Sequence, residues 1–244
     1  MKAWVVFRDS AGRVLTTEDL KGFTGTVNWE VTGGEAVPAQ ARGLHQQARE
    51  AGGRGDYERA LVLLEQAQRL APRWPYPSYD AAFTALLQGD AAKAEELYGQ
   101  VDRLAPRGFF TCKATLDLLR RERAGELFDG FTRAFVQLEW IGDPAEKLAI
   151  LQGIATRFPG LPQVWKELAS LTTDPDDQRR AIENGLAGGP DADTRGTLLI
   201  SRALLLDRSG DRDGAIRLLG RIALDPSSTL GTESLSKAVL ARFF

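Results

Sequence analysis

Side chains that could perform acid–base or metal chemistry are scarce in this sequence. It contains one histidine, His45, and one cysteine, Cys112, among 244 residues. A lone imidazole needs a neighbouring carboxylate, such as Asp80 or Glu30, to serve as an oriented general base. One cysteine and one histidine cannot form a zinc site or an internal disulfide. We therefore predict no catalytic residue, no metal site and no cofactor.

Motifs of the common catalytic and nucleotide-binding sites do not occur in the sequence. There is no glycine-rich phosphate loop, no G-x-S-x-G and no H-E-x-x-H. The acid-rich stretch "DRSGDRDGA" (207–215) is a poor calcium loop, because its glycine is misplaced and Leu218 stands where the terminal Glu is required. We interpret it as a turn between helices, and Cys112 as a small buried hydrophobic residue.

The composition is that of an ordinary globular protein. Apolar residues make up 43% and charged residues 26%, and the formal net charge is −2. A nucleic-acid-binding protein would usually show a basic surplus, so we expect no nucleic-acid partner. No apolar stretch approaches the length of a membrane span, and the apolar run before Arg8 is too short for a signal peptide. We expect a soluble, cytoplasmic protein that does not enter a membrane.

The elements that must position any site are organised as a repeat. The segments "GDYERALVLLEQAQRLAP" (55–72) and "GDAAKAEELYGQVDRLAP" (89–106) match at an offset of 34 residues. In each, Gly-Asp predicts a turn followed by a helix whose N-cap is the Asp carboxylate, at Asp56 and Asp90. The small residues Ala60 and Ala94 allow close helix approach, and a proline ends each helix.

A helix–turn–helix unit of this length and pattern resembles the tetratricopeptide repeat (TPR) family over residues 41–106. The resemblance implies an all-α, TPR-like α-solenoid of helix pairs. Looser copies at 142–159, 174–190 and 210–226 predict further second helices, and 161–171 and 194–210 predict the first helices before the last two. We expect an extra helix at 109–123, a helix at 128–140 that opens the third pair or closes the second, and a capping helix at 232–244.

The chain before Pro38 has a different character. "AWVVF" and "TVNWEV" are rich in β-forming residues, "DSAGR" predicts a turn, and "TTEDLKG" predicts one helical turn. We therefore divide the chain into a small β-rich N-terminal element (1–37) and a helical repeat domain (38–244). We expect all five tryptophans to contribute to packing.

One face of the first helix in each of the two clear repeats is a candidate binding surface. At about 100° per residue, Leu44, Ala48 and Ala51 share a packing face, and three residues fall on another face. Adding 34 residues to each of those three gives an aromatic set. The predicted partner-binding residues are Arg42, His45 and Arg49 with Tyr76, Tyr79 and Phe83. In proteins of the TPR family this stripe lines the concave groove that holds partner peptides.

The resulting hypothesis is a non-catalytic scaffold or adaptor that binds a protein or peptide in its concave groove. The residue types favour an acidic segment beside an apolar anchor. Two alternatives remain open at this point. One is an enzyme or small-ligand sensor with a site between the N-terminal strands and the first repeats, using His45. The other is a structural subunit that dimerises through the β element.

Overall fold

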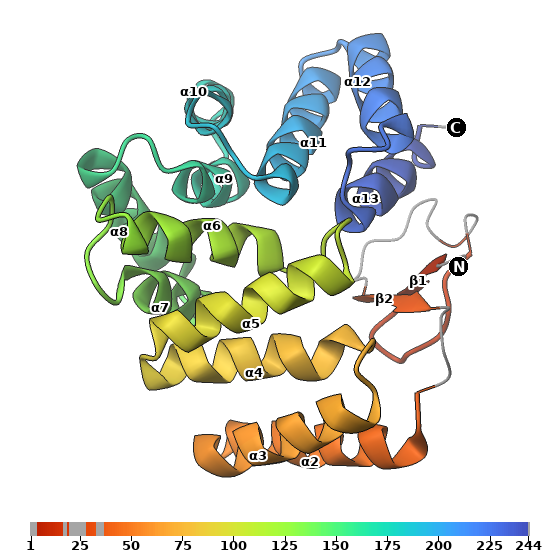
Figure 1. Cartoon of the computed structure of the whole chain (residues 1–244). Coiled ribbons are helices and arrows are strands. Elements are labelled where there is room, and N and C mark those ends of the chain that lie inside the picture. The colour runs from red at the N-terminus through yellow and green to blue at the C-terminus, as the bar shows by residue number, and fades with distance from the viewer. Residues whose placement is uncertain (1–3, 17–18, 20–27, 33–36, 244) are drawn as a thin grey trace. The chain divides into compact units, whose positions relative to one another are not determined.

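A computed structural model describes residues 4–16, 19, 28–32 and 37–243 of the chain. The chain divides into two compact units. We call residues 35–147 the central unit, and residues 1–34 together with 148–244 the terminal unit. Figure 1 shows the helices and strands of both.

The central unit consists of helices that follow one another in antiparallel pairs (Figure 1). α2 packs on α3 and α4 on α5, while α3 contacts α4 and α5 contacts α6. The helices are α2 (Ala39–Gly53), α3 (Tyr57–Leu70), α4 (Pro75–Gln88), α5 (Ala91–Leu104), α6 (Cys112–Arg123) and α7 (Phe131–Val136), followed by the 3-10 helix η1 (Gln137–Trp140). α8 (Pro144–Arg157) begins in this unit and continues into the terminal unit.

The predicted repeat is confirmed by the local geometry of these helices. α3 and α5 each span 14 residues, and their first residues lie 34 positions apart. The side chain of Asp56 accepts a hydrogen bond from the backbone N–H of Arg59, and that of Asp90 from Lys93. Ala60 and Ala94 are fully buried. The all-α, TPR-like fold expected from the sequence is therefore present.

The 34-residue register continues into α6. Four buried positions of α4 recur as buried positions of α6 at this offset, namely Ser78, Ala81, Ala82 and Ala85 as Cys112, Thr115, Leu116 and Leu119. We interpret α6 as the first helix of a third pair and not as an insertion. The burial of Cys112 also agrees with its predicted role as a small hydrophobic residue.

In the terminal unit, the helices expected around 161–171, 174–190, 194–210, 210–226 and 232–244 are present. They are α9 (Pro162–Leu171), α10 (Pro175–Ala187), α11 (Ala192–Arg208), α12 (Arg212–Leu224) and α13 (Leu230–Leu240). α11 contacts both α9 and α13, so these three lie in one layer, with α10 and α12 on the other side. Gly196 permits the approach of α11 to α13, because a Cβ there would lie 2.4 Å from the Thr232 side chain.

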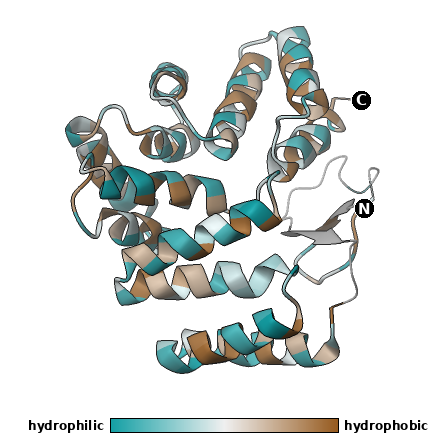
Figure 2. Cartoon of the chain, in the orientation of Figure 1, coloured by the Kyte–Doolittle hydropathy of each residue, from teal (hydrophilic) through white to brown (hydrophobic). Residues whose placement is uncertain are grey.

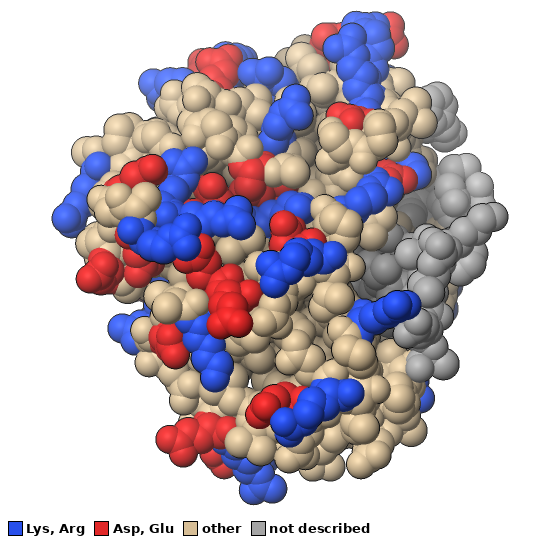
Figure 3. All heavy atoms as spheres, in the orientation of Figure 1, with Lys and Arg blue, Asp and Glu red and all other residues tan. Residues whose placement is uncertain are grey.

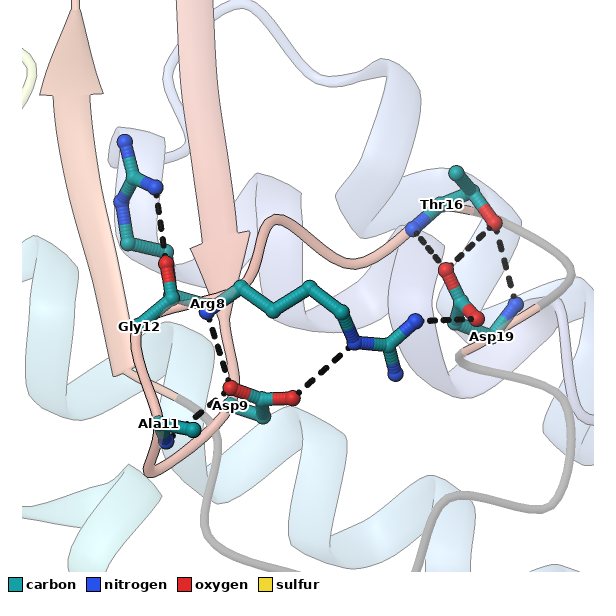
Figure 4. A network of polar contacts seen from close by, with 7 residues as sticks. Arg8, Asp9, Ala11, Gly12, Thr16 and Asp19 are labelled. Atoms are coloured by element: carbon teal, nitrogen blue, oxygen red, sulfur yellow. Dashed lines mark hydrogen bonds and ion pairs between the residues drawn. The ribbon is translucent and has the colours of Figure 1, made fainter.

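The N-terminal element contains the expected strands, β1 (Trp4–Arg8) and β2 (Asn28–Thr32). They pair antiparallel, with Val6 opposite Glu30. The turn after β1 is held by Asp9, whose carboxylate accepts hydrogen bonds from the backbone N–H groups of Ala11 and Arg13 (Figure 4). These bonds, together with Arg13 itself, lower the pKa of the Asp9 carboxyl. Most of the predicted helical turn lies outside the described residues.

Thr16 and Asp19 form a reciprocal pair at the start of that turn. The Asp19 carboxylate accepts hydrogen bonds from the backbone N–H and the hydroxyl of Thr16, and the Thr16 hydroxyl oxygen accepts one from the Asp19 backbone N–H (Figure 4). This is the arrangement of a capping box. Hydrogen bonds from Thr16 and Arg13 lower the pKa of Asp19.

The helices carry both apolar and polar residues, as amphipathic helices do (Figure 2). Cationic and anionic side chains are interspersed on the face shown in Figure 3, in keeping with the net charge of −2. Within the described part of the chain, no helix is both long and apolar enough to span a bilayer.

Candidate protein-binding surface

An aromatic cluster occupies the N-terminal ends of α4 and α6 in the central unit. We use this name for Trp74, Tyr76, Tyr79, Phe109 and Phe110. The ring centroids of Tyr76 and Phe109 lie 4.8 Å apart, and those of Tyr79 and Phe110 lie 5.2 Å apart. Most of the contacts are edge-to-face, the geometry favoured by the quadrupoles of aromatic rings. The cluster joins the second helix pair to the start of the third.

Tyr79 is a half-buried polar member of the cluster. Its hydroxyl lies 2.8 Å from the hydroxyl of Thr111, just before α6. Burial raises the pKa of Tyr79 to about 12, and the hydrogen bonds with Thr111 oppose this shift only in part. The phenol is therefore neutral at physiological pH and serves as a hydrogen-bonding and packing group.

Phe110 is the strained and exposed member of the cluster. Its φ angle is +46°, in the left-handed region that side chains other than glycine rarely adopt. It retains 36% of its accessible surface, whereas Phe109 retains 3%. A left-handed backbone costs a non-glycine residue about 1–2 kcal/mol. The turn therefore presents an aromatic ring to solvent at a conformational cost.

A polar group borders the cluster on the side of α2. The imidazole Nε2 of His45 lies 2.8 Å from the Asp80 carboxylate, and the His45 ring stands edge-on to Trp74 at 4.9 Å. His45 is 8% exposed. The Arg49 Nε lies 3.9 Å from the same Asp80 oxygen, but its side chain is 72% exposed. The guanidinium is thus tethered near Asp80 and still faces water.

The structure brings together most of the residues predicted for the binding stripe. His45, Arg49, Tyr76 and Tyr79 meet around Asp80 and the aromatic cluster. Arg42 is exposed on the first turn of α2. Phe83, one turn beyond Tyr79, is half-buried, and among the described aromatic residues it makes no ring contact with the cluster. Arg42 and Phe83 are the two predicted residues that make no contact with this group among the described residues.

Sequence reasoning missed Phe109, Phe110 and Thr111 as parts of this surface. A signal was available, because Phe110 lies 34 residues after Tyr76 and 68 after Arg42, at the same repeat position. We expected Trp140 to be packed, and this was wrong, since it retains 60% of its surface at the end of η1. Trp165 is half-buried, and its indole N–H donates to the Pro159 carbonyl at 2.6 Å.

A hollow of about 550 Å³ lies between α5 and α6. Its floor includes Gly99, Leu116 and Leu119, and an ion pair of 2.9 Å between Arg123 and Glu95 joins the two helices beside it. His45 does not line it. It is thus separate from the polar group around Asp80.

Comparisons with known proteins show similarity of fold only. No family model matches the chain, and no curated protein matches it. Among solved structures, the chain is similar to MamA 41-end from Desulfovibrio magneticus RS-1, with 15% identity, a TM-score of 0.37 and coverage of 76% of this chain and 94% of MamA.

Two further similar structures are a thermophilic TPR protein and PilF. A thermophilic TPR protein in Thermus thermophilus shows 18% identity and a TM-score of 0.34, covering 82% of this chain and 99% of its own. PilF of Pseudomonas aeruginosa shows 18% identity and a TM-score of 0.36, covering 82% and 97%. At these identities and TM-scores, the similarity carries no information about function.

Proposed function

We propose that this chain is a non-catalytic protein-interaction scaffold that binds a segment of a partner protein at the N-terminal ends of α4 and α6. The observation that carries the proposal is the exposed Phe110 ring, held in a left-handed backbone conformation at the edge of the aromatic cluster. Strained residues persist where the surrounding structure enforces them, and they occur preferentially at functional sites.

The chemistry around Phe110 defines the kind of segment that would bind. Aromatic side chains supply most of the binding free energy at interfaces, and arginine is the preferred charged contributor. Arg42 and Arg49 are exposed on α2, which borders the cluster. An apolar or aromatic anchor would pack against Phe110 and Tyr76, and an acidic residue beside it would pair with an arginine.

Asp80 limits the positive charge available to that acidic residue. Its carboxylate is shared between His45 and Arg49, so Arg42 is the stronger electrostatic contributor of the two arginines. We therefore expect the aromatic anchor to contribute more to the binding affinity than the ion pair with arginine. The affinity should accordingly fall only slightly as the salt concentration rises.

Quantitative affinity capture from the native host tests the proposal. Wild type and the Phe110→Ala and Arg42→Glu variants are used side by side as baits, with Val62→Ala as a matched control. Val62 is an apolar residue of α3 with 53% exposure. A partner that is depleted at least fourfold on Phe110→Ala and retained on Val62→Ala, with unchanged circular dichroism, supports the proposal. A partner set that is the same for all four baits contradicts it.

An enzymatic role is the second candidate, and the His45–Asp80 pair favours it. A carboxylate 2.8 Å from an imidazole is the arrangement that orients a general base. The pair also has a structural explanation, because it ties α2 to α4. His45 is largely buried, and it does not line the hollow between α5 and α6. A His45→Gln variant that folds normally and retains the binding described above would favour the scaffold.

A further inference from the structure

The terminal unit contains a hollow of about 550 Å³ at the C-terminal ends of α9, α11 and α13. Leu204, Val239 and Phe243 supply apolar surface to it, and the hydroxyl-bearing Ser201 also lines it. Leu204 retains 37% of its accessible surface, which is high for a leucine beside a helical core. The hollow lies wholly within the terminal unit and is therefore independent of the aromatic cluster in the central unit.

The charges around this hollow are unbalanced. Arg208, Arg212 and Arg242 line it, against one acid, Asp207. Within the described part of the chain, none of the three arginines has a carboxylate partner. Four other cations of the same unit, Lys166, Arg179, Arg180 and Lys237, are each paired with an acid. The hollow therefore has a local surplus of positive charge.

Two of these arginines are held in place by neutral groups. Arg208 donates a hydrogen bond to the side-chain oxygen of Gln178. Arg212 donates to the backbone carbonyl of Phe243 at 2.7 Å, and its guanidinium lies 4.9 Å from the centre of the Phe243 ring. Hydrogen bonds to neutral acceptors orient a guanidinium without cancelling its charge. Arg208 and Arg212 are thus pre-organised and remain electrostatically available.

We propose that this hollow binds an acidic segment of a partner protein, in which an aliphatic side chain lies between two carboxylates. The aliphatic group would pack on Leu204 and Val239, and the carboxylates would pair with Arg208 and Arg242. Guanidinium–carboxylate pairs are strong, charge-assisted and often bidentate. Asp207 would oppose binding, because its carboxylate carries the same charge as the ligand.

The apolar part of the hollow favours a peptide over a small inorganic anion. A phosphate or sulfate ion could satisfy two arginines but would leave the exposed Leu204 in contact with water. A segment with an aliphatic side chain removes that apolar surface from water and excludes solvent from the ion pairs, which strengthens them. The apolar lining and the charge of the hollow thus favour the same class of ligand.

Fluorescence anisotropy with two rhodamine-labelled peptides, used with the full chain, tests this proposal. The probe is Gly-Ser-Asp-Leu-Glu-Ser-Gly, and the control peptide is Gly-Ser-Asn-Leu-Gln-Ser-Gly. We expect the acidic peptide to bind and the amide peptide to bind about tenfold more weakly or not at all. The Arg208→Gln/Arg242→Gln variant should weaken acidic-peptide binding by about tenfold, and raised salt should reduce the difference.

Two further variants separate ligand contact from a structural role. Asp207→Asn should tighten binding of the acidic peptide by about threefold, since it removes a like charge near the ligand. Arg217→Gln, an exposed arginine of α12 that does not line the hollow, should leave binding unchanged. A loss of structure would not produce a gain on Asp207→Asn, and circular dichroism checks that each variant folds.

Several results would overturn the proposal. These are no binding of the acidic peptide at millimolar protein, equal binding of both peptides, or an equal effect of Arg217→Gln and the double variant. Arginine-dependent binding of inorganic phosphate without binding of the peptide would also overturn it in favour of a simple anion site. Phe110→Ala should not affect this assay, so its outcome is separate from that of the proposed binding surface in the central unit.

Discussion

His45 of α2 and Asp80 of α4 meet at 2.8 Å and link the first helix pair to the second. The His45 side chain is largely removed from solvent and that of Asp80 is half-buried, so loss of Asp80 would leave the imidazole poorly hydrated. A double-mutant cycle with His45→Ala and Asp80→Ala at pH 7.5 should give a coupling free energy of about 1–2 kcal/mol. Urea denaturation of the four proteins measures it. Additive effects of the two substitutions would show that the contact contributes nothing.

Asp56 and Asp90 occupy the same position in two repeats, so we expect their substitution to lower the stability of the protein by similar amounts. Asp56→Ala and Asp90→Ala should each lower the free energy of unfolding by about 1 kcal/mol, because each removes the acceptor for a backbone N–H at the start of a helix. Chemical denaturation measures both. Asp56→Asn and Asp90→Asn serve as controls and should retain most of the stability, since asparagine is also a good N-cap.

Close helix contacts predict a steric effect at Ala60 and Ala94. Both residues are fully buried, and Ala60 lies opposite Gly52 of α2, where a Cβ would approach it to 3.8 Å. Ala→Leu at either position should lower the free energy of unfolding by about 1–3 kcal/mol through overpacking. Thermal and urea unfolding provide the measurement. Unchanged stability in both variants would mean that these are not sites of close approach.

The backbone conformation of Phe110 predicts that glycine and alanine will differ there. Both substitutions remove the ring, but only glycine adopts a φ of +46° without strain. Phe110→Gly should therefore be more stable than Phe110→Ala by about 1 kcal/mol. Denaturation of the two variants in parallel gives the difference. If alanine is as stable as glycine, the left-handed conformation is not enforced.

The raised pKa of Tyr79 leads us to expect that the protein loses stability at alkaline pH. Burial raises its pKa in the folded state to about 12 from the ordinary value of 10.0, so the unfolded phenol ionises first. The free energy of unfolding is therefore at its full value below pH 10 and declines as the pH rises toward 12. At pH 11 the loss should be about 1 kcal/mol. Tyr79→Phe should lose less stability than wild type between pH 9 and pH 11 in urea denaturation. Parallel curves for the two proteins would contradict this prediction.

Much of the fold could be predicted because its signals are local. Gly-Asp turns, N-capping aspartates and terminating prolines act on residues next to them, so Asp56, Asp90 and the helices after them follow from the sequence alone. The 34-residue offset then aligned α2 with α4 and identified the stripe of Arg42, His45 and Arg49 with its aromatic counterparts. Helix periodicity is sufficient to place residues on one face.

Contacts between successive helix pairs were decided only by the tertiary structure. Phe109 and Phe110, which precede α6, contact Tyr76 and Tyr79 of α4. The packing of α2 against α4 brings Asp80 close to both His45 and Arg49. The arginines of the terminal hollow come from three different helices or their ends. Such meetings depend on crossing geometry and side-chain volume summed over many contacts, which no local sequence signal contains.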